Sequence, residues 1–225
     1  MKLQAVLFDL DGVITDTAEY HYLAWKQMAE QIGIEIDRDF NEQLKGISRM
    51  ESLERILVHG RKDHQYSLKH REQLAADKNK HYVSLLAGLA PDHVYPGIGE
   101  LLDQLTEHHV PSVLTSASKN APQILESLGL ADRFYAIADP DGISGKPAPD
   151  IFLKGAELAG ADPRCCIGIE DAQAGIEAIK AAGMYAVGIG DPELLGASGA
   201  DIVYNSTVKL SLASLLQALK QSSSL

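Results

Sequence analysis

The second half of the chain alternates short apolar runs with segments of helical pattern. The runs have the length of buried strands, and the segments between them place apolar residues at helical spacing. This alternation favours a parallel sheet with helices packed on both faces. The predicted strands are Val110–Leu114, Phe134–Ala138, Cys165–Ile169, Tyr185–Ile189 and Asp201–Tyr204, and the predicted helices include Pro122–Leu128, Pro149–Ala159 and Ala172–Ala182.

One further apolar run, Leu3–Leu10, lies far from the other strands in the sequence. The long stretch after it is polar and helix-like, with Thr17 as an expected N-cap and Gly33 as the end of the first helix. We therefore expect an α/β fold: a doubly wound, Rossmann-like parallel sheet core with a small helical cap inserted after the first strand. The core is expected to comprise residues 1–14 and 93–225, and the cap residues 15–92, with hinges near Thr15–Thr17 and Ala90–Val94.

Composition excludes several classes of function. The 225 residues carry a formal net charge of −11, which argues against general binding of nucleic acid. No apolar run approaches the roughly 18–20 residues of a membrane helix, and Asp9 comes too early for a secretory signal. The adjacent Cys165 and Cys166 form no disulfide framework and suit reduced thiols. We expect a cytoplasmic protein without membrane or nucleic-acid partners, ending in a Ser-rich tail over residues 221–225.

Four polar clusters follow predicted strands. They are Asp9 with Asp11, the turn around Ser116, Lys146 before Pro147, and Glu170 with Asp171. In an open parallel sheet, ligands bind at the carboxyl ends of the strands, so these clusters are expected to meet at one edge.

Each cluster has a chemical and a purely structural interpretation. Asp9 and Asp11 suit a nucleophile and a general acid/base, or are simply solvated acids at a strand end. Glu170 and Asp171 could join Asp9 around Mg²⁺, or could cap a helix. Ser116 could hold a phosphate oxygen or belong to an ordinary turn, and Lys146 could bridge phosphate and carboxylate or be a surface lysine.

Taken together in this order, the four clusters resemble the motifs of a known enzyme superfamily. The segments FDLDG (8–12), TSAS (115–118), GKPAPD (145–150) and GIEDAQAG (168–175) resemble the four motifs of the haloacid dehalogenase superfamily. The segments DGVITDTAEYH (11–21), NEQLKGISR (41–49), SASKNAP (116–122) and IEDAQAGI (169–176) are similar to its β-phosphoglucomutase subfamily, which has a small helical cap.

The resemblance implies roles for the residues that match the motifs. Asp9 would be the nucleophile that becomes phosphoaspartate, and Asp11 the general acid/base. Mg²⁺ would be held by Asp9, Glu170, Asp171 and the backbone carbonyl of Asp11. The groups implied to hold the transferring phosphoryl group are Ser116, the Ala117 N–H and Lys146.

The resemblance also implies a second phosphate site and a sugar-binding face. Arg49 would bind the non-reacting phosphate with Ser118, Lys119 and Asn120, and Thr17 and His21 would support Asp11. The cap residues implied to lie over the sugar are Trp25, Leu44, Lys45, Gly46, Ile47, Ser52 and Lys78. Trp25 also fits a helix core, and the other seven histidines (His59, His64, His70, His81, His93, His108 and His109) are expected at the surface.

Three positions depart from the subfamily pattern. Met50 stands where an acid is expected after Arg49, Gly145 replaces Ser or Ala before Lys146, and Thr115 replaces a small residue. None removes a catalytic group. Gly145 could loosen the Lys146 loop, and Met50 removes a charge beside Arg49.

The implied activity is that of a monomeric, Mg²⁺-dependent isomerase acting on a small sugar phosphate. It would interconvert β-D-glucose 1-phosphate and glucose 6-phosphate through β-glucose 1,6-bisphosphate. A sugar-phosphate phosphatase on the same scaffold is the main alternative, because water can replace the sugar hydroxyl. A dehalogenase has no use for the Mg²⁺ ligands, and a phosphoacceptor receiver domain is about half this length and needs no cap.

Overall fold

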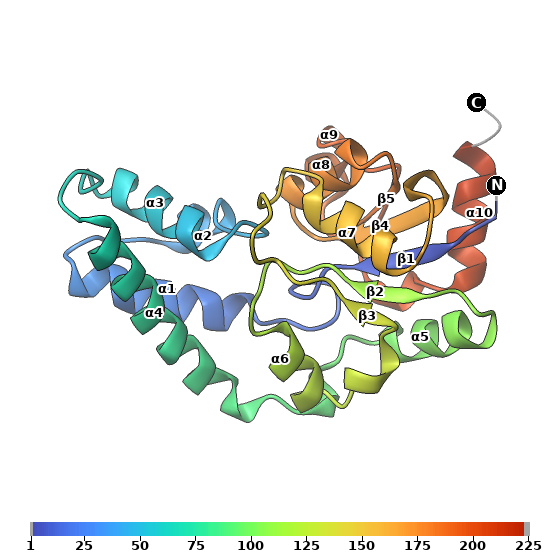
Figure 1. Ribbon diagram of the computed structural model, residues 1–225, viewed down its shortest axis with the longest axis horizontal. Coiled ribbons are helices and arrows are strands. Elements are labelled where there is room, and N and C mark those ends of the chain that lie inside the picture. Colours follow the sequence, from blue (N-terminus) through green and yellow to red (C-terminus); the bar gives the residue numbers. More distant parts are fainter. Residues whose placement is uncertain (1, 223–225) are drawn as a thin grey trace.

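The computed structural model describes residues 2–222 of the chain and contains one six-stranded sheet (Figure 1). All strand pairs are parallel, in the order β3-β2-β1-β4-β5-β6. The predicted doubly wound α/β fold is therefore confirmed. The strands are β1 (Ala5–Phe8), β2 (Ser112–Leu114), β3 (Ala136–Ile137), β4 (Cys166–Glu170), β5 (Tyr185–Ile189) and β6 (Ile202–Tyr204).

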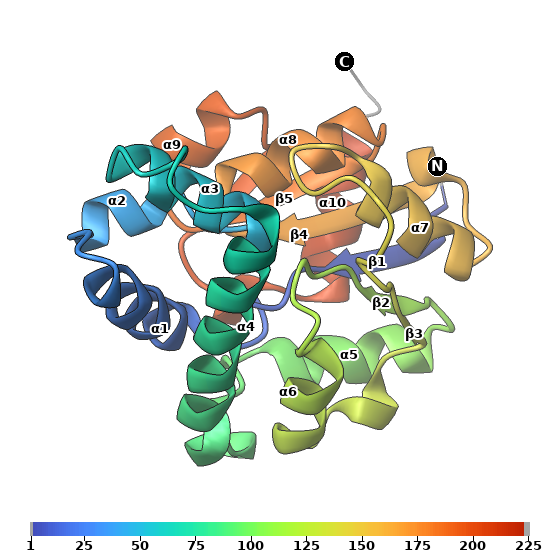
Figure 2. The same cartoon turned by 60° about the vertical axis from the view of Figure 1, so that its left-hand side comes forward.

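Helices cover both faces of the sheet (Figure 2). Because successive strand residues point to opposite faces, β1 contributes Ala5 and Leu7 to one core and Val6 and Phe8 to the other. On the first face pack α7 (Asp150–Leu158), α8 (Gln173–Ala181) and α9 (Pro192–Ala197). On the second pack α5 (Ile98–Glu107), α6 (Ala121–Ser127) and α10 (Leu212–Ser222).

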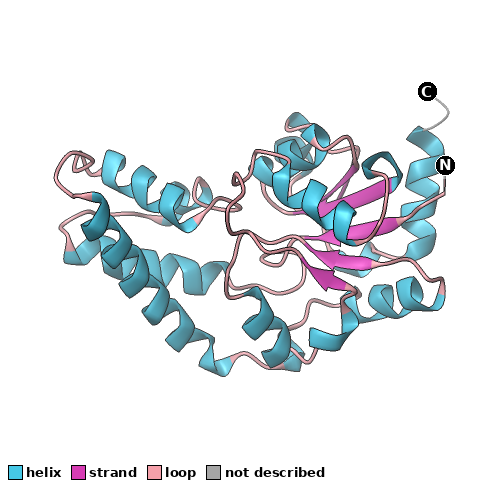
Figure 3. Ribbon diagram, viewed as in Figure 1, coloured by secondary structure: helices cyan, strands magenta, loops and turns pink. Residues whose placement is uncertain are grey.

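Between β1 and β2 in the sequence, the chain forms a helical segment that lies beside the sheet (Figure 3). Its helices are α1 (Ala18–Gln31), α2 (Arg38–Glu42), α3 (Arg49–His59) and α4 (Leu68–Leu85). They enclose a core of their own, which includes Trp25, Leu53 and Ile56. Side chains of Asp37, Ser48 and Ser67 cap α2, α3 and α4, so the sequence fixes where these helices begin.

The two connections of this segment to the sheet lie side by side. Thr15 forms bridges with Asp11 and with Val94, and the backbone N–H of Tyr95 donates to the carbonyl of Ile14 at 2.9 Å. The Thr15 hydroxyl donates to the carbonyl of His93 at 2.8 Å. The chain thus leaves and re-enters the sheet-bearing part at one place, where hinges were predicted.

The short 3₁₀ helices are Leu86–Gly88, Pro91–His93, Ala131–Arg133, Pro163–Cys165 and Thr207–Lys209.

Several local expectations needed correction. The strands β1, β2, β3 and β6 are shorter than predicted, and helices α9 and α10 were not predicted. Helix α10 continues into the expected tail as far as Ser222, while residues 223–225 lie outside the described residues. His81 is half-buried rather than a surface residue, and its Nδ1 atom has no hydrogen-bond partner among the described residues.

Within residues 2–222, no helix has both the length and the apolar character required to span a bilayer.

Candidate active site

The predicted carboxylates gather at the carboxyl ends of β1 and β4, the central pair of the sheet. Phe8 is in register with Ile169, so Asp9 and Glu170 emerge next to each other where β1 and β4 end. The backbone N–H of Asp9 donates to the carbonyl of Ile169 at 3.0 Å. From β1 the chain continues to β2 and β3 on one side, and from β4 it continues to β5 and β6 on the other. A doubly wound sheet has its binding crevice between two strands whose connections diverge in this way.

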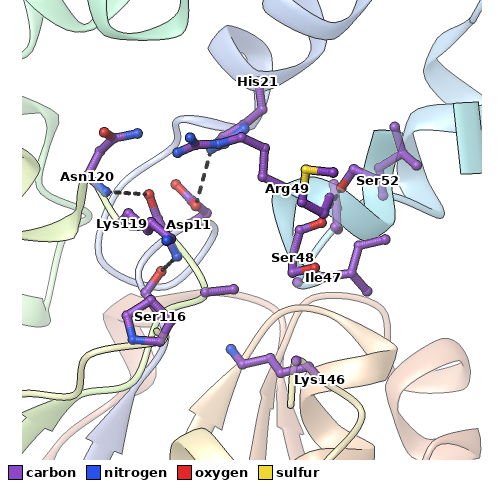
Figure 4. Close-up of a pocket in the computed structure, with 18 of the residues that line it drawn as sticks. Asp11, His21, Ile47, Ser48, Arg49, Ser52, Ser116, Lys119, Asn120 and Lys146 are labelled. Carbon is purple, nitrogen blue, oxygen red and sulfur yellow. Dashed lines mark hydrogen bonds and ion pairs between the residues drawn. The ribbon is translucent and has the colours of Figure 1, made fainter. Parts of the chain in front are cut away.

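A cavity of about 400 Å³ lies above these strand ends (Figure 4). His21 and Arg49 enter it from the helical segment, and Ser116, Lys119 and Lys146 from loops of the sheet. Thr17 and Glu170 are not in its lining and lie behind Asp11 and Lys146. The other predicted residues that line it are Asp9, Asp11, Trp25, Leu44, Lys45, Gly46, Ile47, Ser52, Lys78, Ala117, Ser118, Asn120 and Asp171.

Lys146 is buried between two carboxylates. Its Nζ atom lies 2.6 Å from Asp9 Oδ1 and 2.5 Å from Glu170 Oε1. Burial disfavours the ammonium form, but the two carboxylates outweigh burial and raise the pKa of Lys146. Burial raises the pKa of Asp9 to about 6, with Lys146 acting in the opposite direction. Lys146 is therefore a fixed positive charge beside Asp9, not a surface lysine.

Three carboxylates form a cluster suited to a hard cation. Asp9, Glu170 and Asp171 each offer an oxygen atom, and these atoms lie within 4.8 Å of one another. Burial raises the pKa of Asp171 well above its ordinary value, and the neighbouring Glu170 and Asp9 raise it further. Lys146 contacts Asp9 and Glu170 but not Asp171, on which the more distant Lys45 acts. An all-oxygen donor set of three carboxylates fits Mg²⁺.

Two glycines leave the space that the carboxylates of Asp171 and Glu170 occupy. Gly12 has φ +78°, and a Cβ atom there would overlap the Asp171 carboxylate. A Cβ atom at Gly175, in α8, would overlap the Glu170 carboxylate. Glu170 also accepts hydrogen bonds from the N–H groups of Asp171 and Ala172, at 2.8 and 2.9 Å. The orientation of Glu170 is thus fixed by its surroundings.

Asp11 is held by groups from the helical segment. The Thr17 hydroxyl donates to Asp11 Oδ1, and His21 Nε2 lies 3.8 Å from Asp11 Oδ2. Thr17 stands at the N-cap position of α1 but makes no side-chain capping bond, which corrects the expected cap. Burial raises the pKa of Asp11 to about 8, Asp9 adds to this, and Lys78 opposes it. A carboxyl group with this pKa can both donate and accept a proton near neutral pH.

Two positively charged side chains, Lys78 and Arg49, line the same cavity as the carboxylates of Asp9, Asp11 and Asp171. Lys78 is buried, and burial together with Arg49 lowers its pKa to about 7. Burial also lowers the pKa of Arg49. Lys78 Nζ lies 2.8 Å from His21 Nδ1 and 4.5 Å from the centre of the Trp25 ring. A buried lysine whose pKa is lowered by burial and by a neighbouring guanidinium group indicates a place for an anion.

The contact with Lys78 also bears on the charge and the tautomer of the His21 ring. The pKa of His21 is lowered by burial and then by Lys78 and Arg49, so the ring is neutral. When Lys78 is protonated, its ammonium donates to Nδ1, and the ring proton is then on Nε2, facing Asp11. In that state His21 presents an N–H group toward Asp11, with Nε2 3.8 Å from Oδ2.

The turn after β2 presents polar groups to the same cavity. The N–H of Ser118 donates to Ser116 Oγ at 3.1 Å, and the N–H of Asn120 donates to Ser118 Oγ at 3.3 Å. Lys119 forms an ion pair with Asp141. The backbone here is a turn stabilised by its own hydroxyls, consistent with both interpretations of Ser116.

The loop before α3 approaches the sheet closely. Gly46 has φ +72°, and a Cβ atom there would lie 3.2 Å from Ala172 Cβ. Ser52 donates to the carbonyl of Ser48 at 3.0 Å, and Lys45 pairs with Glu42 at 2.8 Å. Trp25 is buried in the core of the helical segment and also lines the cavity, so both interpretations of it hold.

Some residues of the site were not predicted. Met50, Glu72 and Ile143 line the cavity. Asn79 Oδ1 accepts a 2.8 Å hydrogen bond from Asn120, and Tyr82 donates to Thr17 at 3.2 Å. Tyr82 is four residues after Lys78, a spacing that places both on one face of a helix and was the available signal.

Comparison with known proteins agrees with this geometry. Residues 3–183 match the model of a family described as haloacid dehalogenase-like hydrolase. The β-phosphoglucomutase of Bacillus subtilis (strain 168) is 50% identical over 220 residues, covering 97% of this chain and 96% of that protein. A fructose-1-phosphate phosphatase of Escherichia coli (strain K12) is 32% identical over 193 residues, covering 84% and 97%.

A solved structure extends the likeness to three dimensions. The crystal structure of β-phosphoglucomutase from Clostridium difficile superimposes with a TM-score of 0.96 at 45% identity. The match covers 99% of this chain and 100% of that one. The helical segment and the sheet are thus both included in the likeness.

Proposed function

The chain belongs to the haloacid dehalogenase-like hydrolase family, and from this membership and the geometry of the site we propose that it acts as a β-phosphoglucomutase. It is an isomerase that interconverts β-D-glucose 1-phosphate and glucose 6-phosphate. The observation that carries the proposal is a single cavity with cations at both ends, Lys146 beside Asp9 and Arg49 with Lys78 opposite. Such a cavity suits a sugar that carries phosphate at both ends.

Asp9 is the proposed nucleophile. Its phosphorylated form transfers the phosphoryl group to the sugar, giving β-glucose 1,6-bisphosphate, which reorients and returns its other phosphoryl group to Asp9. Asp11 acts as general acid/base, deprotonating the attacking hydroxyl and protonating the leaving oxygen. Thr17 and His21 orient Asp11 for these proton transfers. The pKa of about 8 supports this role, because both protonation states are accessible near neutral pH.

The cation we assign to the carboxylate cluster is Mg²⁺. Asp9, Glu170 and Asp171 would hold it with the backbone carbonyl of Asp11. When bound, it supplies positive charge that offsets the charge of the transferring phosphoryl group. Lys146, the Ser116 hydroxyl and the Ala117 N–H hold the same phosphoryl group in line with Asp9.

Arg49, Ser118, Lys119 and Asn120 form the proposed site for the second phosphate. A guanidinium group binds phosphate through two parallel hydrogen bonds, so Arg49 fixes orientation as well as charge. The residues assigned to the face over the sugar are Trp25, Leu44, Lys45, Gly46, Ile47, Ser52 and Lys78. Their position along the cavity wall supports this assignment.

The wider organisation follows from the same proposal. Residues 15–92 form the cap and residues 1–14 with 93–225 form the core, with hinges at the paired connections near Thr15 and Val94. Closure of the cap would exclude water from phosphorylated Asp9. We place the enzyme in the cytoplasm as a monomer acting on a small sugar phosphate. The free thiols of Cys165 and Cys166 support the compartment.

One assay tests the function. β-D-Glucose 1-phosphate, Mg²⁺ and a trace of the bisphosphate are supplied, and glucose 6-phosphate and inorganic phosphate are measured in the same tube. The proposal requires fast formation of glucose 6-phosphate with little free phosphate. Asp9→Asn should abolish it, and the remote exposed Asp132→Asn should not. Dominant phosphate release at every bisphosphate concentration would instead indicate a sugar-phosphate phosphatase.

A further inference from the structure

Tyr82 is a fully buried residue of α4 whose hydroxyl reaches the acid/base site. Its side chain is 0% exposed, and its hydroxyl donates to Thr17 Oγ1 at 3.2 Å. Thr17 in turn donates to Asp11 Oδ1. The three groups form a directed chain that runs from Tyr82 through Thr17 to the Asp11 carboxylate.

The ring of Tyr82 contacts the other two groups that surround Asp11. It packs against the imidazole of His21 with ring centres 4.0 Å apart. Lys78 Nζ lies 4.7 Å from the centre of the Tyr82 ring, within the range of a cation–π contact. One buried side chain therefore touches Thr17, His21 and Lys78 together.

We propose that Tyr82 is a positioning residue for the general acid/base, acting on Asp11 through the Thr17 hydroxyl. The inference rests on the proposed function, in which Asp11 moves protons. Thr17 occupies the N-cap position of α1, where a threonine hydroxyl ordinarily accepts from backbone N–H groups of the first turn. Here it makes no capping bond.

The hydrogen-bonding capacity of the two hydroxyl groups explains why Thr17 does not cap the helix. A threonine hydroxyl has one proton and two acceptor positions. The Tyr82 hydroxyl fills an acceptor position of Thr17 and so leaves the Thr17 proton directed at Asp11. Burial raises the pKa of Tyr82, with Asp11 adding to the effect, so the phenol remains a donor at every pH at which the enzyme works. Hydrogen bonds in such a chain also polarise one another.

The test is Tyr82→Phe, which removes the hydroxyl and keeps the ring. We expect kcat for formation of glucose 6-phosphate to fall about three- to tenfold, the effect of one lost neutral hydrogen bond. KM should stay within about twofold, because Tyr82 does not line the cavity. Tyr135→Phe, at an exposed tyrosine, is the matched control and should match the wild type.

A second measurement separates positioning from general damage. Acetyl phosphate can phosphorylate Asp9 with loss of acetate, a leaving group that needs no proton from Asp11. The rate of this step should be the same in Tyr82→Phe and in the wild type. If it falls in parallel with kcat, Tyr82 has a purely structural role and the proposal is overturned.

A double-mutant cycle tests the path through Thr17. Thr17→Val alone should lower kcat, and adding Tyr82→Phe should lower it no further. Additive losses, or an unchanged kcat in Tyr82→Phe, would overturn the proposal. Should the wild type form no glucose 6-phosphate, the proposed function fails. The same ratios are then measured on phosphate release from glucose 6-phosphate, which also needs a proton on the leaving oxygen.

Discussion

The Nζ atom of Lys146 lies 2.6 Å from the Oδ1 atom of Asp9, and both side chains are shielded from water. The same ammonium contacts Glu170, so one cation separates two buried carboxylates. The ion pair keeps the proposed nucleophile ionised despite its burial. It also makes the stability of the fold depend on a residue of the site.

Lys146→Met should therefore lower both stability and activity. Removing one partner of a buried ion pair leaves unpaired charge, and the free energy of unfolding should fall by about 3–5 kcal/mol. Loss of charge beside the phosphoryl group should lower kcat at least about 100-fold. Denaturant unfolding and the coupled assay measure the two effects. The exposed Lys69→Met is the control, and adding Glu170→Gln should recover part of the stability but no activity. Unfolding at the wild-type midpoint would contradict the prediction.

Mg²⁺ should stabilise the protein more at about pH 8 than at about pH 5.5. The pKa of Asp9 is raised to about 6 and that of Asp171 is raised, so protons compete with the cation at the lower pH. Without metal, these groups and Asp11 bind more protons in the folded state than in the unfolded state. The contribution of these three carboxyl groups to metal-free stability should therefore decrease as pH rises from about 4 to about 8, while His21 and Lys78, whose pKa values are lowered, act in the opposite direction. Melting curves with Mg²⁺ and with a chelator measure both trends, and an equal metal-induced shift at both pH values would refute the first.

Gly175→Ala should weaken metal binding although Gly175 is not itself a ligand. The new methyl group would collide with the carboxylate of Glu170 and displace it. We expect the dissociation constant for Mg²⁺ to rise about tenfold or more, as for loss of a group that orients a ligand. Calorimetric titration measures it. Gly99→Ala is the matched control, since this glycine of α5 faces open space and its substitution should leave Mg²⁺ binding unchanged. Equal affinities in the two variants would count against the assignment.

Arg49→Lys should raise KM for β-D-glucose 1-phosphate about tenfold while kcat changes less. Lysine retains the charge but not the paired hydrogen bonds of a guanidinium group. Arg55→Lys, on the same helix but bound to Glu51 and the carbonyl of Gln43, is the control. Steady-state kinetics of both variants measure the effect. An unchanged KM in Arg49→Lys would remove Arg49 from the second phosphate site.

The fold and the position of the site were largely predictable, because both follow from local patterns. Alternating apolar runs predict the parallel sheet, and polar residues after each run predict the edge at which the site forms. That Asp9 and Glu170 touch one ammonium depends on the pairing of β1 with β4, whose paired residues are 161 positions apart. The sequence predicts that Lys146 could bridge phosphate and a carboxylate, but without the strand order it does not specify which carboxylates the lysine contacts.

Contacts between helices distant in the sequence were also missed. Tyr82 and Thr17 are 65 residues apart, and Asn79 and Asn120 are 41 apart. Nothing in either local pattern specifies the partner, because crossing angles and side-chain orientations arise only on packing. Thr17 shows the same limit: its position at a helix start predicts a cap, but its hydroxyl binds Asp11.

The cavity wall is assembled from two kinds of chain segment. Asp9, Ser116, Lys146 and Asp171 come from four separate loops of the sheet, whereas Trp25, Arg49 and Lys78 come from one uninterrupted stretch. The part of the cavity wall that the helical segment supplies is therefore encoded in a single contiguous block. Recombination at two points, near Thr15 and Val94, which lie side by side in the fold, can replace that block and leave the strand ends that carry Asp9 and Asp171 unchanged. Diversification of sugar selectivity on this scaffold needs no coordinated change in the sheet.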